Sequence, residues 1–66
     1  MIISLNGESR ELPEQSTIAD LVAALDLVGK RFAVEVNEDV VPKSEHATHQ
    51  LCDGDKLEIV HAVGPG

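Results

Sequence analysis

Apolar and polar residues alternate at the start of the chain, and this pattern predicts a strand over residues 1–6. The apolar face of that strand consists of Met1, Ile3 and Leu5. Asn6-Gly7 follows, and this dipeptide favours a tight hairpin because both of its residues tolerate positive φ. Residues 9–12 then form the returning strand, which Pro13 ends.

After Thr17 the apolar spacing changes to three and four residues, which predicts one amphipathic helix. Its apolar stripe consists of Ile18, Leu21, Val22 and Leu25. Thr17 and Asp20 have the spacing of a capping box at the start of a helix. Gly29 suits the left-handed position that commonly follows the last helical turn.

Three further segments are rich in β-branched residues and predict strands over 32–37, 40–41 and 56–63. The residues expected to face the core are Val34, Val36, Leu57 and Ile59. Pro42 stops the short second segment, which suits an edge strand. The polar segment 44–50 has room for one helical turn.

This order of elements predicts an α+β roll, in which a mixed sheet of four to five strands packs on one main helix. We expect one domain over residues 1–63. Gly64-Pro65-Gly66 offers no large side chain to pack, so residues 64–66 are expected to form a flexible tail.

Size and charge limit the functions that this chain can have. A domain of 66 residues has little room for a deep pocket, which favours a carrier or binding module over an enzyme. Twelve acidic residues against five basic ones argue against nucleic acid and anionic membranes as partners and favour a basic protein. Cys52 is the single cysteine, which excludes an intrachain disulfide and suits the reducing cytoplasm.

Several segments, taken in order and spacing, resemble the ThiS family of thiamine-biosynthesis sulfur carriers, within the wider ThiS/MoaD ubiquitin-like group. The segments that carry the resemblance are Ile-Ser-Leu-Asn-Gly-Glu at 3–8, Ser-Thr-Ile-Ala-Asp-Leu at 16–21, Ala-Val-Glu-Val-Asn at 33–37, Val-Val-Pro-Lys at 40–43 and Asp-Gly-Asp-Lys-Leu-Glu-Ile at 53–59. The resemblance covers the whole chain and implies a β-grasp, ubiquitin-like fold.

The resemblance also implies a reaction at the Gly66 carboxylate. A partner enzyme adenylates this carboxylate with ATP, a sulfur donor enzyme supplies the sulfur, and a thiazole synthase accepts it from the resulting thiocarboxylate. The chain is then a substrate of enzymes with no bound cofactor and no metal of its own. The family ends in Gly-Gly, whereas this chain has Pro65 between Gly64 and Gly66, so we expect reduced activation.

Val60 and Ala62 alternate with the expected core residues of the last strand. They should therefore face away from the helix, on an open face of the sheet beside the tail. Apolar residues at such a position suggest a docking patch for a partner.

Three alternatives stay open from the sequence. One is a MoaD-like carrier for molybdopterin or another sulfur-transfer pathway, and a second is a TGS-like or ubiquitin-like binding module without terminal chemistry. A third is a metal-binding regulator, because His46, His49 and Cys52 recur every three residues. We favour another interpretation over the metal site. The histidines are expected to lie on the surface, and Cys52 is expected to be a small buried residue without a nucleophilic role.

Overall fold

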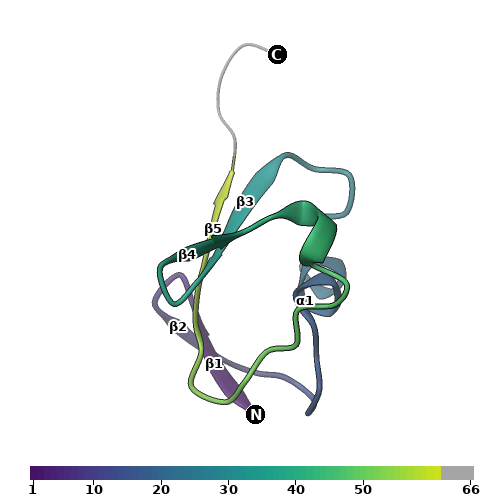
Figure 1. Cartoon of the computed structure of the whole chain (residues 1–66). Helices are drawn as coiled ribbons and strands as arrows, with labels where there is room; N and C mark the ends of the chain where they lie inside the picture. Colours follow the sequence, from purple (N-terminus) through teal and green to yellow (C-terminus); the bar gives the residue numbers. More distant parts are fainter. Residues whose placement is uncertain (62–66) are drawn as a thin grey trace.

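The computed structural model describes residues 1–61, and these contain five strands, one α-helix and one 3₁₀ helix. In chain order the elements are β1 (Ile2–Leu5), β2 (Glu8–Glu11), α1 (Ile18–Ala24), β3 (Phe32–Val36), β4 (Asp39–Val41), the 3₁₀ helix η1 (Lys43–Glu45) and β5 (Lys56–His61). The strands form one sheet in the order β2-β1-β5-β3-β4 (Figure 1). β1 and β5 run parallel while the other neighbours are antiparallel, so the predicted mixed sheet is confirmed.

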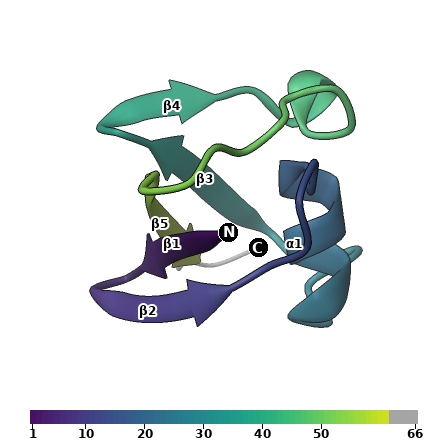
Figure 2. The same ribbon diagram turned by 90° about the horizontal axis from the view of Figure 1, so that it is seen from below.

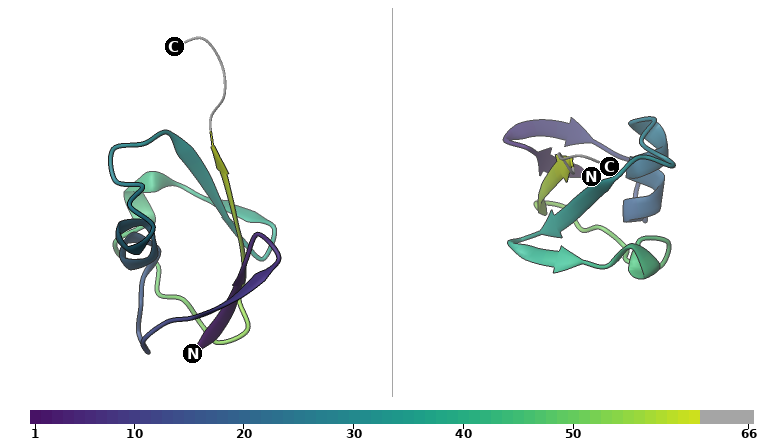
Figure 3. Two further views of the ribbon diagram at one scale, coloured as in Figure 1. Left: turned by 180° about the vertical axis from the view of Figure 1, so that it is seen from behind. Right: turned by 90° about the horizontal axis from the view of Figure 1, so that it is seen from above.

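The helix α1 packs on one face of this sheet, and no other described element covers the opposite face (Figure 2). Views from behind and from above show the same two layers (Figure 3). We call the uncovered side the open face. The core lies between α1 and the sheet, and its fully buried side chains are Ile3, Ile18, Leu21, Val34 and Leu57. The predicted apolar stripe of the helix and the predicted inner faces of the strands all contribute to it.

The first hairpin forms at Asn6-Gly7 as the dipeptide predicts, with φ of 50° and 84° at the two residues. The returning strand β2 begins one residue earlier than predicted. All four of its residues are exposed, and β2 is an edge strand of the sheet. Leu12 follows the strand and is buried in the core.

The start of α1 is a capping box, as predicted. The Thr17 hydroxyl accepts from the Asp20 N–H at 3.2 Å, and the Asp20 carboxylate accepts from the Thr17 N–H at 2.9 Å. These two bonds satisfy donors that the first helical turn leaves without a backbone partner.

The end of α1 differs from the prediction, because the helix stops at Ala24 and Gly29 lies in a later turn. Asp26 takes the left-handed position with φ of 59°. Its N–H donates to the Ala23 carbonyl at 3.1 Å, and the Leu27 N–H donates to the Val22 carbonyl at 3.0 Å. This bond pattern is a Schellman motif, in which Leu27 folds back onto the core and thereby ends the helix early.

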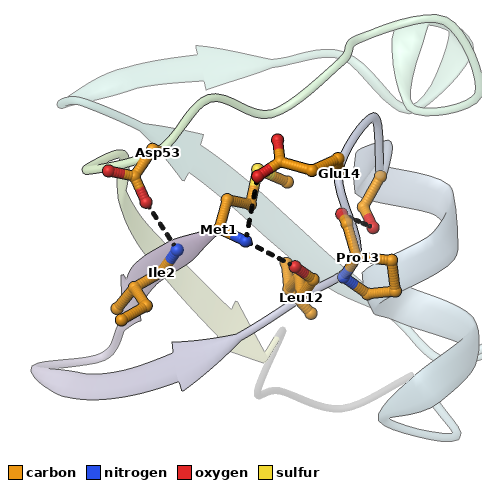
Figure 4. Close-up of polar contacts among 7 residues, drawn as sticks. Met1, Ile2, Leu12, Pro13, Glu14 and Asp53 are labelled. Carbon is orange, nitrogen blue, oxygen red and sulfur yellow. Dashed lines mark hydrogen bonds and ion pairs between the residues drawn. The ribbon is translucent and has the colours of Figure 1, made fainter.

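The beginning of β1 is fixed by contacts with two distant segments (Figure 4). The Met1 amino group donates to the Leu12 carbonyl at 2.8 Å and lies 3.4 Å from the Glu14 carboxylate. The Ile2 N–H donates to Asp53 Oδ1 at 2.7 Å. Asp53 belongs to the turn before β5, so this bond aligns the start of β1 with the start of β5.

The segment between β4 and β5 contains η1, which confirms a helical turn there but places it at Lys43–Glu45. β4 is the other edge strand, as predicted, and Val41 packs into the core. Within residues 1–61, neither helix has the length and apolarity needed to cross a membrane.

Candidate functional site

β5 leads the chain toward the predicted reactive end and lies at the centre of the sheet. β3 pairs with it from Val36 opposite Leu57 to Phe32 opposite His61. β1 pairs with only its first part, at Lys56 and Leu57. The last described residue, His61, is therefore held from one side by β3.

Two asparagine side chains extend the pairing of β5. Asn6 follows the end of β1, and its Oδ1 accepts from the Ile59 N–H at 2.9 Å while its Nδ2 donates to the Ile59 carbonyl at 3.4 Å. Asn37 follows β3, and its Oδ1 accepts from the Lys56 N–H at 3.0 Å. The side chains replace backbone partners where the neighbouring strands end, so both turns hold β5 in register.

The predicted reactive residues lie beyond the described part of the chain. Gly64, Pro65, Gly66 and the predicted docking residue Ala62 all fall in residues 62–66. Their assignments stay predictions, and the structure defines the strand that leads to them.

Val60 lies on the open face, as its alternation with Leu57 and Ile59 predicts. Its side chain is 54% exposed, and it pairs directly with Ala33 of β3, which is also exposed. Val40 of β4 is 67% exposed. These three residues form an apolar patch on the open face. Val60 and Ala33 share one cross-strand row, and Val40 lies in the next row toward the start of β5.

Two carboxylates share a cross-strand row with Val40 of this patch. Glu35 of β3 and Glu58 of β5 are directly opposite each other, and both are half-buried. Glu35 is also opposite Val40 on its other side. The sequence does not predict this pair, because alternation tells which face each residue occupies but not which residues become neighbours across two strands.

His46 is a core residue, and its predicted surface position is wrong. It is 7% exposed, and its ring stacks on Phe32 with the ring centroids 6.1 Å apart. Its Nε2 lies 3.1 Å from the Val41 carbonyl oxygen. The hydrogen bond and the stacking satisfy the imidazole within the fold, which is why a histidine can be buried here.

Cys52 is exposed, which corrects the prediction of a small buried residue. It precedes the turn before β5, where its N–H donates to the Asp55 carboxylate at 2.8 Å. His49 is half-buried, and residues 1–61 contain no group of three side chains placed to hold a metal ion. The spacing of three therefore does not produce a metal site in the described chain.

A shallow groove lies between α1 and the segment after β4. Val28, Phe32, Lys43 and His46 contribute to its walls, and its volume is about 240 Å³. This is below the usual range of ligand pockets, roughly 300–1,000 Å³. Its lining is mostly apolar and brings together no nucleophile and base.

Comparison with known proteins identifies the chain's relatives. The ThiS family model matches residues 3–66. The sulfur carrier protein ThiS of Bacillus subtilis is 38% identical over 98% of this chain and 100% of its own length. A thiazole synthase of Paramagnetospirillum magneticum is 41% identical over the whole chain, which spans only 20% of that larger protein.

A solved structure agrees with this relationship. The crystal structure of the thiamine biosynthesis protein ThiS from Geobacter metallireducens superposes with a TM-score of 0.86 and 25% identity, and the match covers all of both chains. This likeness confirms the predicted β-grasp fold. By family match, relatives and fold together, the chain belongs to the ThiS family.

Proposed function

We propose that this chain is a sulfur carrier of thiamine biosynthesis and that the Gly66 carboxylate carries the sulfur. The main support is the family match, which extends to residue 66 itself. The alignment with the full length of the Bacillus subtilis carrier supports the same assignment.

The chemistry needs a terminus that can be activated. A C-terminal carboxyl has a pKa of about 3.3–3.7 and is ionised at neutral pH. One carboxylate oxygen attacks the α-phosphorus of ATP on a partner enzyme, pyrophosphate leaves, and an acyl adenylate forms. A hydrosulfide-type nucleophile then attacks the carbonyl carbon, the bond to AMP breaks, and a thiocarboxylate remains.

The partners follow from these steps. An adenylating enzyme binds the ATP, a sulfur donor enzyme supplies the sulfur, and a thiazole synthase consumes the thiocarboxylate. The thiazole synthase is supported by the relative from Paramagnetospirillum magneticum, because that synthase contains a stretch 41% identical to this chain. Fusion of the two functions in one chain keeps the carrier close to its acceptor.

The described fold suits a carrier better than an enzyme. β5 is held by β3 and by the Asn6 side chain as it leads toward the terminus, and the open face offers an apolar patch beside it. We propose that this patch, together with the predicted docking residue Ala62, docks the partners. The cytoplasmic location, the lack of a bound cofactor and the lack of an activity of its own stay predictions.

Mass spectrometry of the intact protein tests the proposal. The chain is incubated with its adenylating enzyme, ATP and a sulfide source, and we expect the mass increase of one oxygen-to-sulfur exchange. A variant that lacks Gly66 is the control and should gain nothing. Wild-type protein that forms neither adenylate nor thiocarboxylate would overturn the proposal.

A second measurement separates the sulfur destinations. The thiocarboxylate form is given to thiazole synthase with its other substrates, and we expect thiazole product and loss of the sulfur from the carrier. Transfer to a molybdopterin precursor instead would assign the chain to the MoaD-like route.

A further inference from the structure

Glu35 and Glu58 are placed in a way that the fold itself does not explain. They are paired directly across β3 and β5 on the open face, and both are half-buried. Like charges directly opposite in a sheet destabilise it. Among residues 1–61, the one ion pair joins the Met1 amino group to Glu14, so neither carboxylate is in an ion pair. The exposed Lys56 lies two residues before Glu58 on the same face of β5 and forms no ion pair with it.

The surroundings of this pair make its charge important for docking. Val40 lies opposite Glu35, and the exposed Val60–Ala33 pair forms the next row on the same face. Glu35 is the direct neighbour of Val40, and Glu58 lies two residues before Val60 on the same face, so a partner that covers Val60 and Val40 also covers both carboxylates. Removing two carboxylates from water is strongly unfavourable unless the partner supplies a cation.

We propose that an arginine-bearing surface of thiazole synthase docks on this face, with a guanidinium placed between Glu35 and Glu58 and apolar side chains on Val60 and Val40. This inference rests on the proposed function, which names the synthase. A guanidinium suits the position because its planar fork donates to two carboxylates and its weakly hydrated faces tolerate apolar neighbours. The net charge of −7 adds a field that favours a cationic partner.

The proposal makes the acidic pair a selectivity element. A partner without a cation at this position leaves two desolvated carboxylates unpaired, which weakens its binding. The apolar patch supplies contact area for any apolar partner surface. The carboxylate pair restricts tight binding to a partner surface that also carries a cation.

Binding measurements on the full chain test this inference. Calorimetric titration with full-length thiazole synthase from the same organism compares wild type with E35Q/E58Q. The control is E38Q/E45Q, which removes the same number of charges from exposed residues outside the open face. We expect E35Q/E58Q to raise Kd by at least about tenfold and to weaken its salt dependence, while the control changes Kd by less than about threefold.

Two further readouts keep the outcomes distinct. The melting temperature of E35Q/E58Q should equal or exceed that of wild type, because the repulsion between the carboxylates is removed. A clear decrease would contradict the claim that the two carboxylates repel each other in the free protein. Equal Kd values for wild type and E35Q/E58Q, or equal losses in both double variants, would overturn the inference. Failure of wild type to form a thiocarboxylate with the adenylating enzyme refutes the proposed function instead, and that measurement does not involve the synthase.

Discussion

Asn6 pairs its side-chain amide with the backbone of Ile59 in both directions, at 2.9 Å and 3.4 Å. The residues are 53 positions apart, and the contact takes over where β1 stops pairing with β5. One side chain thus joins the first hairpin to the strand that leads to the terminus.

Replacing Asn6 by glycine should destabilise the protein without straining the turn. Glycine tolerates the positive φ of this position, so the change isolates the loss of the amide. We expect unfolding in urea to show a loss of about 1–2 kcal/mol, together with faster hydrogen exchange at the Ile59 amide. N6D is the matched control, because it keeps the acceptor for the Ile59 N–H and should lose less; an equal loss in both variants would contradict this role.

The capping box at the start of α1 gives a second stability prediction. T17A removes the hydroxyl that accepts from Asp20, and we expect a loss of about 1 kcal/mol in denaturant unfolding. T17S keeps the hydroxyl and should be close to wild type. If T17A and T17S were equally stable, the cap would have no energetic importance.

His46 should matter for stability and not for metal binding. H46A removes the stacking on Phe32 and leaves the Val41 carbonyl without its buried partner, so we expect a loss of about 2 kcal/mol. H49A should change stability by less than about 0.5 kcal/mol. Zinc that copurifies with wild type but not with H46A would contradict this assignment.

Local signals in the sequence predicted the parts of the fold that depend on neighbouring residues. The hairpin at Asn6-Gly7 and the cap at Thr17 follow from backbone preferences and short-range hydrogen bonds, and both were found. The prediction for the end of α1 was wrong. It placed the left-handed residue that follows the helix at Gly29, whereas Asp26 adopts that conformation. Packing of Leu27 onto the core decides that position, and such packing is not visible in a local pattern.

The candidate site was predictable to a lesser degree. Alternation along the last strand placed Val60 on the open face, and the structure confirms its exposure. The burial of His46 depends on Phe32 of β3 and Val41 of β4, and the sequence pattern around His46 does not show these contacts. The opposition of Glu35 and Glu58 depends on the register of β3 against β5, which the sequence alone does not determine.

The apolar patch gives a prediction about partner binding. V60D places a charge within the patch and on the same face as Glu58, so we expect Kd for thiazole synthase to rise by at least about tenfold. The fold should persist, because the side chain is already 54% exposed. V28D is the control, since Val28 is 73% exposed and lies in the segment between α1 and β3, away from the open face. Unchanged affinity of V60D would remove the patch from the docking surface.

Pro65 provides the sharpest test of the terminal chemistry. Proline lacks a backbone N–H and fixes φ near −65°, whereas the glycine typical of the family has the N–H and an unrestricted φ. A partner channel that receives an extended terminus can hydrogen-bond to that N–H, which is worth about 1 kcal/mol, or roughly fivefold in rate. We therefore expect P65G to be adenylated roughly fivefold faster than wild type, measured as pyrophosphate release with the adenylating enzyme and ATP.

P65A separates the two effects of proline, because alanine restores the N–H but keeps a Cβ. A rate for P65A close to that of P65G would show that the missing N–H limits activation, while a rate close to wild type would show that the channel needs the narrower glycine. Identical rates for wild type and P65G would refute any penalty from Pro65. The adenylating enzyme would then activate the Gly66 carboxylate equally fast whether proline or glycine precedes it.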